Sequence, residues 1–178
     1  MEDIIKVCAL GGLDENGRDC YVIEINNDIF VLDAGLALPD KTIPGVDFLL
    51  TNAQYIISNK DRVKAYIITH AHDENMGALK YFYDDAPAPI ICTRFTKHII
   101  ETQFNFNKLQ GTLDFRVIPP SCDLEIAGRK FHSSKLLITP PIHLVSPLRQ
   151  VGVTSFTPAT SSLTIQSRIP LISLISKL

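Results

Sequence analysis

Residues 63–76 read VKAYIITHAHDENM, a buried strand that runs into a polar loop. The apolar, β-rich run Val63–Thr69 predicts the strand, the loop His70–Asn75 follows directly, and a helix is predicted over Met76–Tyr83. Layered α/β folds place their functional sites in loops at the carboxyl ends of strands. This order of elements therefore predicts that the chemistry of the protein lies in the loop His70–Asn75.

Short β-rich and helical segments flank this unit on both sides. Strands are predicted over Ile4–Leu10, Cys20–Ile25, Ile29–Leu32, Ile90–Thr93 and Phe115–Ile118. Helices are predicted over Thr51–Asn59 and Phe95–Thr102. Strands that first pair as hairpins and then alternate with helices indicate a layered α/β domain.

The polar loop brings together residue types that bind zinc. His70 and His72 are two residues apart, and Asp73 and Glu74 follow them. Imidazole nitrogens and carboxylate oxygens at the end of a strand can hold a zinc ion, which could then activate water for hydrolysis. The pattern H-x-H with nearby acids is a weak signal by itself, because a solvated loop whose histidines cap the next helix would look the same. The residues alone leave both interpretations open.

The segments around this loop carry a family resemblance. They are ALGGLDENG at 9–17, YVIE at 21–24, FVLDAGL at 30–36, IITHAH at 67–72 and GAL at 77–79. In this order and spacing, residues 4 to about 132 resemble the ribonuclease J family, which has the metallo-β-lactamase fold and belongs to the β-CASP group. The resemblance implies an αββα sandwich with two zinc ions and 5′-to-3′ exonuclease and endonuclease action on RNA.

Site residues follow from the family's metal loop, which reads H-x-H-x-D-H. His70 and His72 match the first two ligands, Glu74 stands in place of the catalytic Asp, and Asn75 stands in place of the last His. Glu shifts the carboxylate by about one methylene, and the Asn amide is a poor substitute for imidazole on zinc. Asp33 matches the Asp of the family's D-A-G segment, where the resemblance implies a structural role at the foot of the site.

Several parts of the family pattern are not found. The resemblance implies a further His, an Asp and a late His as ligands, and a second nuclease domain that helps to hold RNA. His132 and His143 lie outside the family's sequence context and receive no role, and His98 is predicted on a helix surface. We therefore expect the N-terminal half of the sandwich, weak or partial zinc binding, and no assigned RNA-binding residue.

Composition changes abruptly near the end of this resemblance. All 19 acidic residues lie between Glu2 and Glu125, and the remaining 53 residues carry six basic residues and no acidic one. A folded segment ordinarily mixes both signs on its surface. From Leu136 the chain is rich in Leu, Ile, Ser, Thr and Pro and has no sustained period. We predict a partial metallo-β-lactamase domain over residues 1–132 and an irregular, non-family tail over residues 133–178.

Two explanations of the tail stay open. One is a genuine, divergent C-terminus. The other is a shifted reading frame that begins near Ser133–Leu136. Codons that are legal for Lys135–Gln166 can be read two bases downstream as TTHNAPNSFGVSFK and onward, which resembles the family's next segment and restores its ligand His.

Overall composition narrows the class of protein. The 178 residues, 46% of them hydrophobic, fit one domain, and a net charge of −2 argues against a wholly basic nucleic-acid binder. No run approaches the roughly 18 apolar residues of a membrane span, and the start, Met1–Asp3, is acidic where a signal peptide is basic. We expect a soluble, cytoplasmic protein without membrane contact. The four cysteines form no C-x-x-C pair and are expected to be small core residues.

Three functions are compatible with these observations. The first is a truncated ribonuclease J-like, zinc-dependent RNA nuclease that is inactive or impaired. The second is a non-catalytic assembly partner of an active, full-length ribonuclease J paralogue. The third is another hydrolase of the metallo-β-lactamase fold, such as a thiolester or lactam hydrolase, which the segment Gly11–Gly17 makes less favourable.

Overall fold

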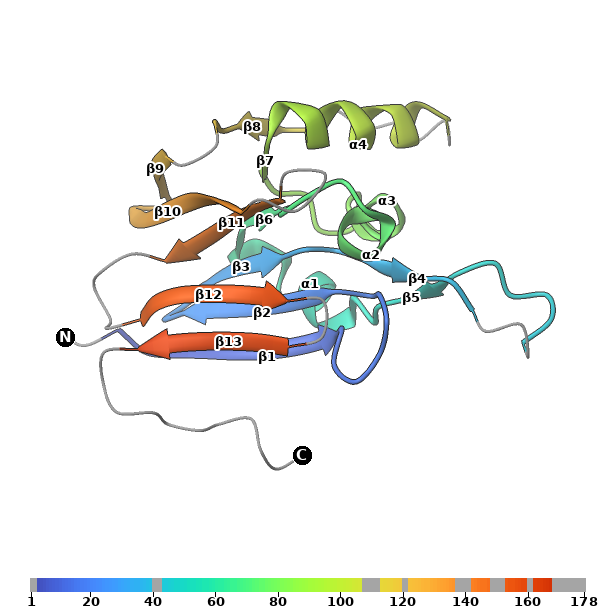
Figure 1. Ribbon diagram of the computed structural model, residues 1–178, viewed down its shortest axis with the longest axis horizontal. Coiled ribbons are helices and arrows are strands. Elements are labelled where there is room, and N and C mark those ends of the chain that lie inside the picture. The colour runs from blue at the N-terminus through green and yellow to red at the C-terminus, as the bar shows by residue number, and fades with distance from the viewer. Residues whose placement is uncertain are drawn as a thin grey trace.

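A computed structural model of the chain describes residues 3–39, 43–106, 113–119, 122–136, 142–147, 153–159 and 162–167. Its main feature is a six-stranded sheet in the order β1-β2-β3-β6-β7-β8 (Figure 1). These strands are β1 (Ile5–Gly11), β2 (Cys20–Ile25), β3 (Asp28–Leu32), β6 (Val63–Ile67), β7 (Ile90–Cys92) and β8 (Phe115–Val117). A short ribbon of β4 (Leu36–Ala37) and β5 (Leu49–Leu50) lies apart from this sheet.

Two types of strand pairing meet at β3. Strands β1, β2 and β3 are antiparallel neighbours joined by short connections, as the hairpin signals in the sequence predicted. From β3 onward the pairs β3–β6, β6–β7 and β7–β8 are parallel, and helices lie in the connections. The predicted layered α/β class is confirmed.

Helices cover one face of the sheet. They are α1 (Gln54–Ser58), the 3-10 turn η1 (Lys60–Arg62), α2 (Asp73–Met76), α3 (Leu79–Phe82) and α4 (Arg94–Phe106). Ile56, Leu79 and Ile100 of these helices pack into a core with Val31 and Tyr66 of the sheet. This burial of apolar side chains is the main term that stabilises the layer.

A smaller sheet covers the opposite face. It is formed by β9 (Cys122–Ile126), β10 (Arg129–Leu136) and β11 (Ile142–Pro147) in the order β11-β10-β9. Leu124 and Phe131 of this sheet join a second core with Phe30 and Ile67, and the rings of Phe30 and Phe131 are 5.0 Å apart. The result is a helix layer, a sheet and a second sheet, which is part of a sandwich.

Strands continue into the tail and cross residue 133. β10 runs through Ser133, and β12 (Val153–Ala159) pairs with β13 (Ser162–Ser167) as a hairpin. The prediction of an irregular tail is wrong for β11, β12 and β13. Hairpin pairing satisfies backbone groups whatever the side-chain period is, so the missing alternation was a poor guide here.

Two smaller expectations also need correction. Cys20 and Cys92 are core residues as expected, but Cys8 is exposed and Cys122 is only partly buried. Cys8 lies on β1, an edge strand that has no buried residue. An apolar run in a sequence does not reveal which strand will lie at the edge of a sheet. No helix in the described part of the chain is long and apolar enough to cross a membrane.

Candidate functional site

The candidate site lies where β6 ends and the chain turns into α2. The predicted loop His70–Asn75 is shorter than expected, because α2 begins at Asp73 rather than at Met76. Glu74 and Asn75 therefore lie in the first turn of a helix, and His72 precedes that helix in extended conformation. His70 and Asn75 are buried, whereas His72, Asp73 and Glu74 are exposed.

The two histidines face one another. His70 Nε2 is 3.1 Å from His72 Nδ1, and the ring planes are at 71°. On the other side of the His70 ring, Nδ1 is 3.0 Å from the Thr69 hydroxyl. That hydroxyl is 2.9 Å from each oxygen of Asp33.

When Asp33 is ionised, these contacts favour one tautomer of the His70 ring. An ionised Asp33 can only accept hydrogen bonds, so the Thr69 hydroxyl donates to it and accepts from His70 Nδ1–H. His70 Nε2 is then left with a lone pair directed at His72. Burial, with a smaller effect from His72, lowers the pKa of His70 to about 4, which keeps the ring neutral at neutral pH. Neutral imidazole oriented by a hydrogen bond from its second nitrogen is the form that binds metals.

Asp33 is held at the foot of the site by neutral donors. Its carboxylate accepts the backbone N–H of Thr69 at 2.8 Å, the Thr69 hydroxyl, and the side-chain amide of Asn75 at 2.9 Å. Complete burial raises its pKa to about 7, and the donors from Thr69 and Asn75 oppose that rise. Its positive φ of 59° lets the side chain leave the end of β3 and reach Thr69.

Asn75 links Asp33 to a second carboxylate. The same amide nitrogen lies 3.2 Å from Asp19 Oδ2. Burial raises the pKa of Asp19 to about 6, the bond from Asn75 lowers it, and the nearby charges of Glu74 and Glu15 raise it. Asn75 is therefore a donor to carboxylates at the position where the family pattern has a ligand His.

Backbone contacts hold these segments closely together. Asp19 N–H donates to Glu74 O at 2.9 Å, and Ala34 N–H donates to Asn75 O at 2.7 Å. A Cβ added to Gly35 would lie 1.5 Å from Glu74 O. Gly35 is required here because only a residue without a side chain allows the two backbones to approach this closely.

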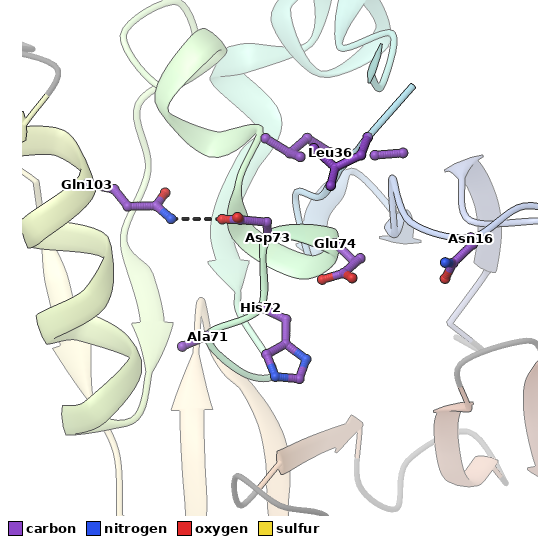
Figure 2. A pocket seen from close by; sticks show the side chains of 9 residues that line it. Asn16, Leu36, Ala71, His72, Asp73, Glu74 and Gln103 are labelled. Atoms are coloured by element: carbon purple, nitrogen blue, oxygen red, sulfur yellow. Dashed lines mark hydrogen bonds between the residues drawn. The ribbon is translucent and has the colours of Figure 1, made fainter. Parts of the chain in front are cut away.

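A pocket of about 480 Å³ opens beside the histidines (Figure 2). Its lining residues are Asn16, Leu36, Ala37, Leu38, Ala71, His72, Asp73, Glu74 and Gln103. Figure 2 shows Asp73 turned toward Gln103, whose amide donates to it at 2.8 Å. His72 and Glu74 are thus the two predicted site residues that line the pocket, whereas His70, Asn75 and Asp33 are not among its lining residues.

His70 and His72 can supply two of the four ligands of one tetrahedral zinc ion. Two nitrogen ligands of a tetrahedral zinc, each about 2.0–2.1 Å from the metal, are about 3.3 Å apart, and His70 Nε2 and His72 Nδ1 are 3.1 Å apart. In the described part of the chain, no group of three or more His, Cys, Asp or Glu residues is arranged to hold a metal. The Asn75 amide nitrogen donates to Asp33 Oδ2, and Asp33 Oδ1 accepts hydrogen bonds from Thr69. Among the residues that the structure describes, none form a ligand set for a second ion.

Comparison with known proteins identifies relatives by sequence and neighbours by fold. The chain is 44% identical over 92 residues to ribonuclease J2 of Bacillus subtilis, 32% identical over 136 residues to ribonuclease J of Thermus thermophilus, and 40% identical over 122 residues to ribonuclease J 2 of Streptococcus pyogenes. The N-terminal portion of this chain is related to ribonuclease J. No family model matches the chain.

The relationship to ribonuclease J is partial in length. The three alignments cover 52%, 73% and 68% of this chain, but only 17%, 24% and 22% of the relatives. Among solved structures, the human tRNase Z short form has a TM-score of 0.56 at 13% identity. The match covers 81% of this chain and 64% of the tRNase Z chain. A diphosphatase of the PhnP family has a TM-score of 0.51 at 13% identity, covering 79% of this chain and 54% of its own. These structural matches establish the metallo-β-lactamase fold.

Some site residues were not found from the sequence. Asp19 and Thr69 contact the predicted residues, and Asn16 and Gln103 line the pocket. Thr69 could have been found, because it immediately precedes the first histidine at the end of a strand. Asp19 is 56 positions from Asn75 and has no sequence signal that connects the two.

Proposed function

We propose that this chain carries the metal-binding half of a ribonuclease J-like hydrolase site that acts on RNA. The observation that supports this most directly is the pair His70 Nε2 and His72 Nδ1, whose separation suits one zinc ion. When bound, zinc would polarise a phosphodiester oxygen or activate water. Glu74 lines the same pocket and can accept a proton there.

We further propose that the activity is impaired. A two-metal mechanism needs ligands for a second ion to clamp the attacking and leaving oxygens. Asn75 and Asp33 are committed to one another by a 2.9 Å hydrogen bond. We therefore expect weak zinc binding and little or no RNA degradation by this chain.

Zinc titration of the purified chain, followed by an assay with 5′-monophosphorylated RNA, tests both parts. We expect measurable zinc binding that His72→Ala abolishes and His98→Ala leaves unchanged, because His98 is exposed on α4 and does not line the pocket. Wild-type affinity in the His72→Ala variant would contradict the zinc site. Rapid, zinc-dependent RNA degradation would contradict the impairment.

A second candidate function is a non-catalytic assembly partner of an active, full-length ribonuclease J. The commitment of Asn75 to two carboxylates favours it, because a subunit kept for assembly does not need a second metal ion. Co-purification with a full-length ribonuclease J is the test, and failure to associate would count against this role. Turnover of thiolester or lactam substrates would instead support the third hydrolase class.

We also propose that residues 133–178 form a non-family tail that arises from a shifted reading frame. One observation at the break supports this. Ser133 is fully buried, and its hydroxyl has no hydrogen-bond partner among the described residues, which costs about 1–3 kcal/mol. Resequencing the coding DNA across Gly128–Pro141 tests the proposal. An inserted or deleted base would support it, and an unaltered frame would contradict it.

A further inference from the structure

A buried amide joins one buried and one partly buried carboxyl group near the histidine pair. The nitrogen Nδ2 of Asn75 is 2.9 Å from Asp33 Oδ2 and 3.2 Å from Asp19 Oδ2. Asn75 is 5% exposed, and Asp33 is completely buried. The two protons of one NH₂ group can serve both oxygens at once.

These two carboxylates have no cationic partner in the described part of the chain. The ion pairs found there involve other acids, and Arg18, the neighbour of Asp19, pairs with Glu15 instead. Two acids brought together in a buried place repel each other unless a cation or hydrogen-bond donors compensate. The Asn75 amide is the one side-chain donor that they share.

The surrounding backbone holds the amide in this place. Asp19 N–H donates to Glu74 O, Ala34 N–H donates to Asn75 O, and Gly35 leaves no room for a side chain between these segments. These contacts fix the backbone from which the Asn75 side chain extends toward the two carboxylates.

We propose that the Asn75 amide is a built-in substitute for a cation between Asp19 and Asp33. It stabilises this side of the site without metal, and it occupies the position that a second ion beside the histidines would need. These effects of Asn75 on stability and on ion binding do not depend on whether the chain acts on RNA.

Thermal unfolding with and without a millimolar excess of calcium tests the proposal. Calcium prefers oxygen ligands and does not compete for the imidazoles. We expect calcium to leave the Tm of the wild-type chain unchanged. Asn75→Asp replaces the donor by a third carboxylate, so we expect its Tm to fall by roughly 5–10 °C and calcium to restore at least half of the loss. Asn27→Asp is the matched control, because Asn27 is exposed in a turn.

A charge-swapped variant decides the outcome even if Asn75→Asp does not fold. Asp19→Asn combined with Asn75→Asp restores one donor and one acceptor at the same place with the direction reversed. We expect this double variant to fold and to recover part of the lost Tm, because the contact with position 19 regains a donor whereas the contact with Asp33 does not. Additive losses in the double variant, an Asn75→Asp loss no larger than that of Asn27→Asp, or equal stabilisation of the wild type by calcium would each overturn the proposal.

Discussion

Two carboxylates are buried at opposite ends of the β2–β3 pair, and they are held in opposite ways. Asp33 follows β3 and receives hydrogen bonds from neutral donors of Thr69 and Asn75. Glu24 lies on β2, is 6% exposed, and contacts the Tyr55 hydroxyl, Arg62 at 2.8 Å and Lys6 at 3.7 Å.

The pKa values of these carboxylates shift in opposite directions. Burial raises the pKa of Asp33 to about 7. The hydrogen bond from Tyr55, followed by Arg62 and Lys6, lowers the pKa of Glu24 although burial opposes this. The Tyr55 hydroxyl together with the cations Arg62 and Lys6 compensates the buried charge of Glu24, whereas the site carboxylate has uncharged donors only. The difference shows that the acidic side of the site is organised by hydrogen bonds rather than by fixed cations.

The largest effect is expected from Gly35→Ala. This substitution disturbs the backbone near Asp33 and leaves the contacts of Glu24 unchanged. A Cβ at this position would lie 1.5 Å from Glu74 O, and backbone at both sides prevents relief. We expect a loss of about 4 kcal/mol or more in the free energy of unfolding, measured by urea denaturation. Gly45→Ala is the control, because its Cβ would meet nothing within 4 Å and only its positive φ is strained, at a cost of about 1 kcal/mol. Equal losses in both variants would show that the close approach at Gly35 is absent.

Arg62→Met tests the Glu24 side. It removes the closest cation from a buried carboxylate and retains apolar bulk, so we expect a loss of about 2 kcal/mol in unfolding free energy. The comparison variant is Lys97→Met, whose exposed pair with Glu101 at 3.5 Å should contribute less than about 0.5 kcal/mol. If the two variants lose the same stability, Glu24 does not depend on Arg62.

A smaller effect is expected from Thr69→Val, which keeps the shape of the side chain and removes its hydroxyl. Asp33 loses one donor, which should cost about 1–2 kcal/mol in stability. His70 loses the acceptor that orients its ring, so zinc affinity should fall about tenfold. Thr102→Val is the control, since its hydroxyl bonds to the His98 carbonyl on exposed α4. Unchanged zinc affinity in Thr69→Val would separate the histidine pair from Asp33.

The smallest effect is a change in the pH dependence of stability. Glu24 has a folded pKa below its unfolded value of 4.5, so its contribution is present above pH 4.5 and is lost as the pH falls through the folded pKa. In Glu24→Gln, Tm should therefore fall less steeply as the pH is lowered below 4.5. Asp33 has a raised pKa, so its contribution has the opposite sign and is lost as the pH rises from about 4 to about 7. If Tm of Glu24→Gln falls at acid pH as steeply as that of the wild type, protonation of Glu24 does not cause the fall.

The local sequence pattern was sufficient to predict most of the strands and helices and some of the site residues. The hydrophobic runs placed β2, β3, β6 and β7 to within two residues, because strand patterns depend on near neighbours. The motif H-x-H placed His70 and His72 at the end of a strand. Helix α2 began earlier than predicted, because Asp73 and Glu74 suit a first helical turn as well as a loop.

What the sequence determined by itself was the layered α/β class, the position of the histidine loop and the resemblance to ribonuclease J, since these depend on residue type and spacing along the chain. Only the tertiary structure decided that the Asn75 amide joins Asp19 and Asp33, that Cys8 lies on an edge strand, and that the tail forms hairpins. These depend on segments that are far apart in sequence and meet only when the sheet is assembled. The pairing of Asn75 with Asp19, 56 positions away, is the clearest case, because no local pattern records which distant group will satisfy a buried donor.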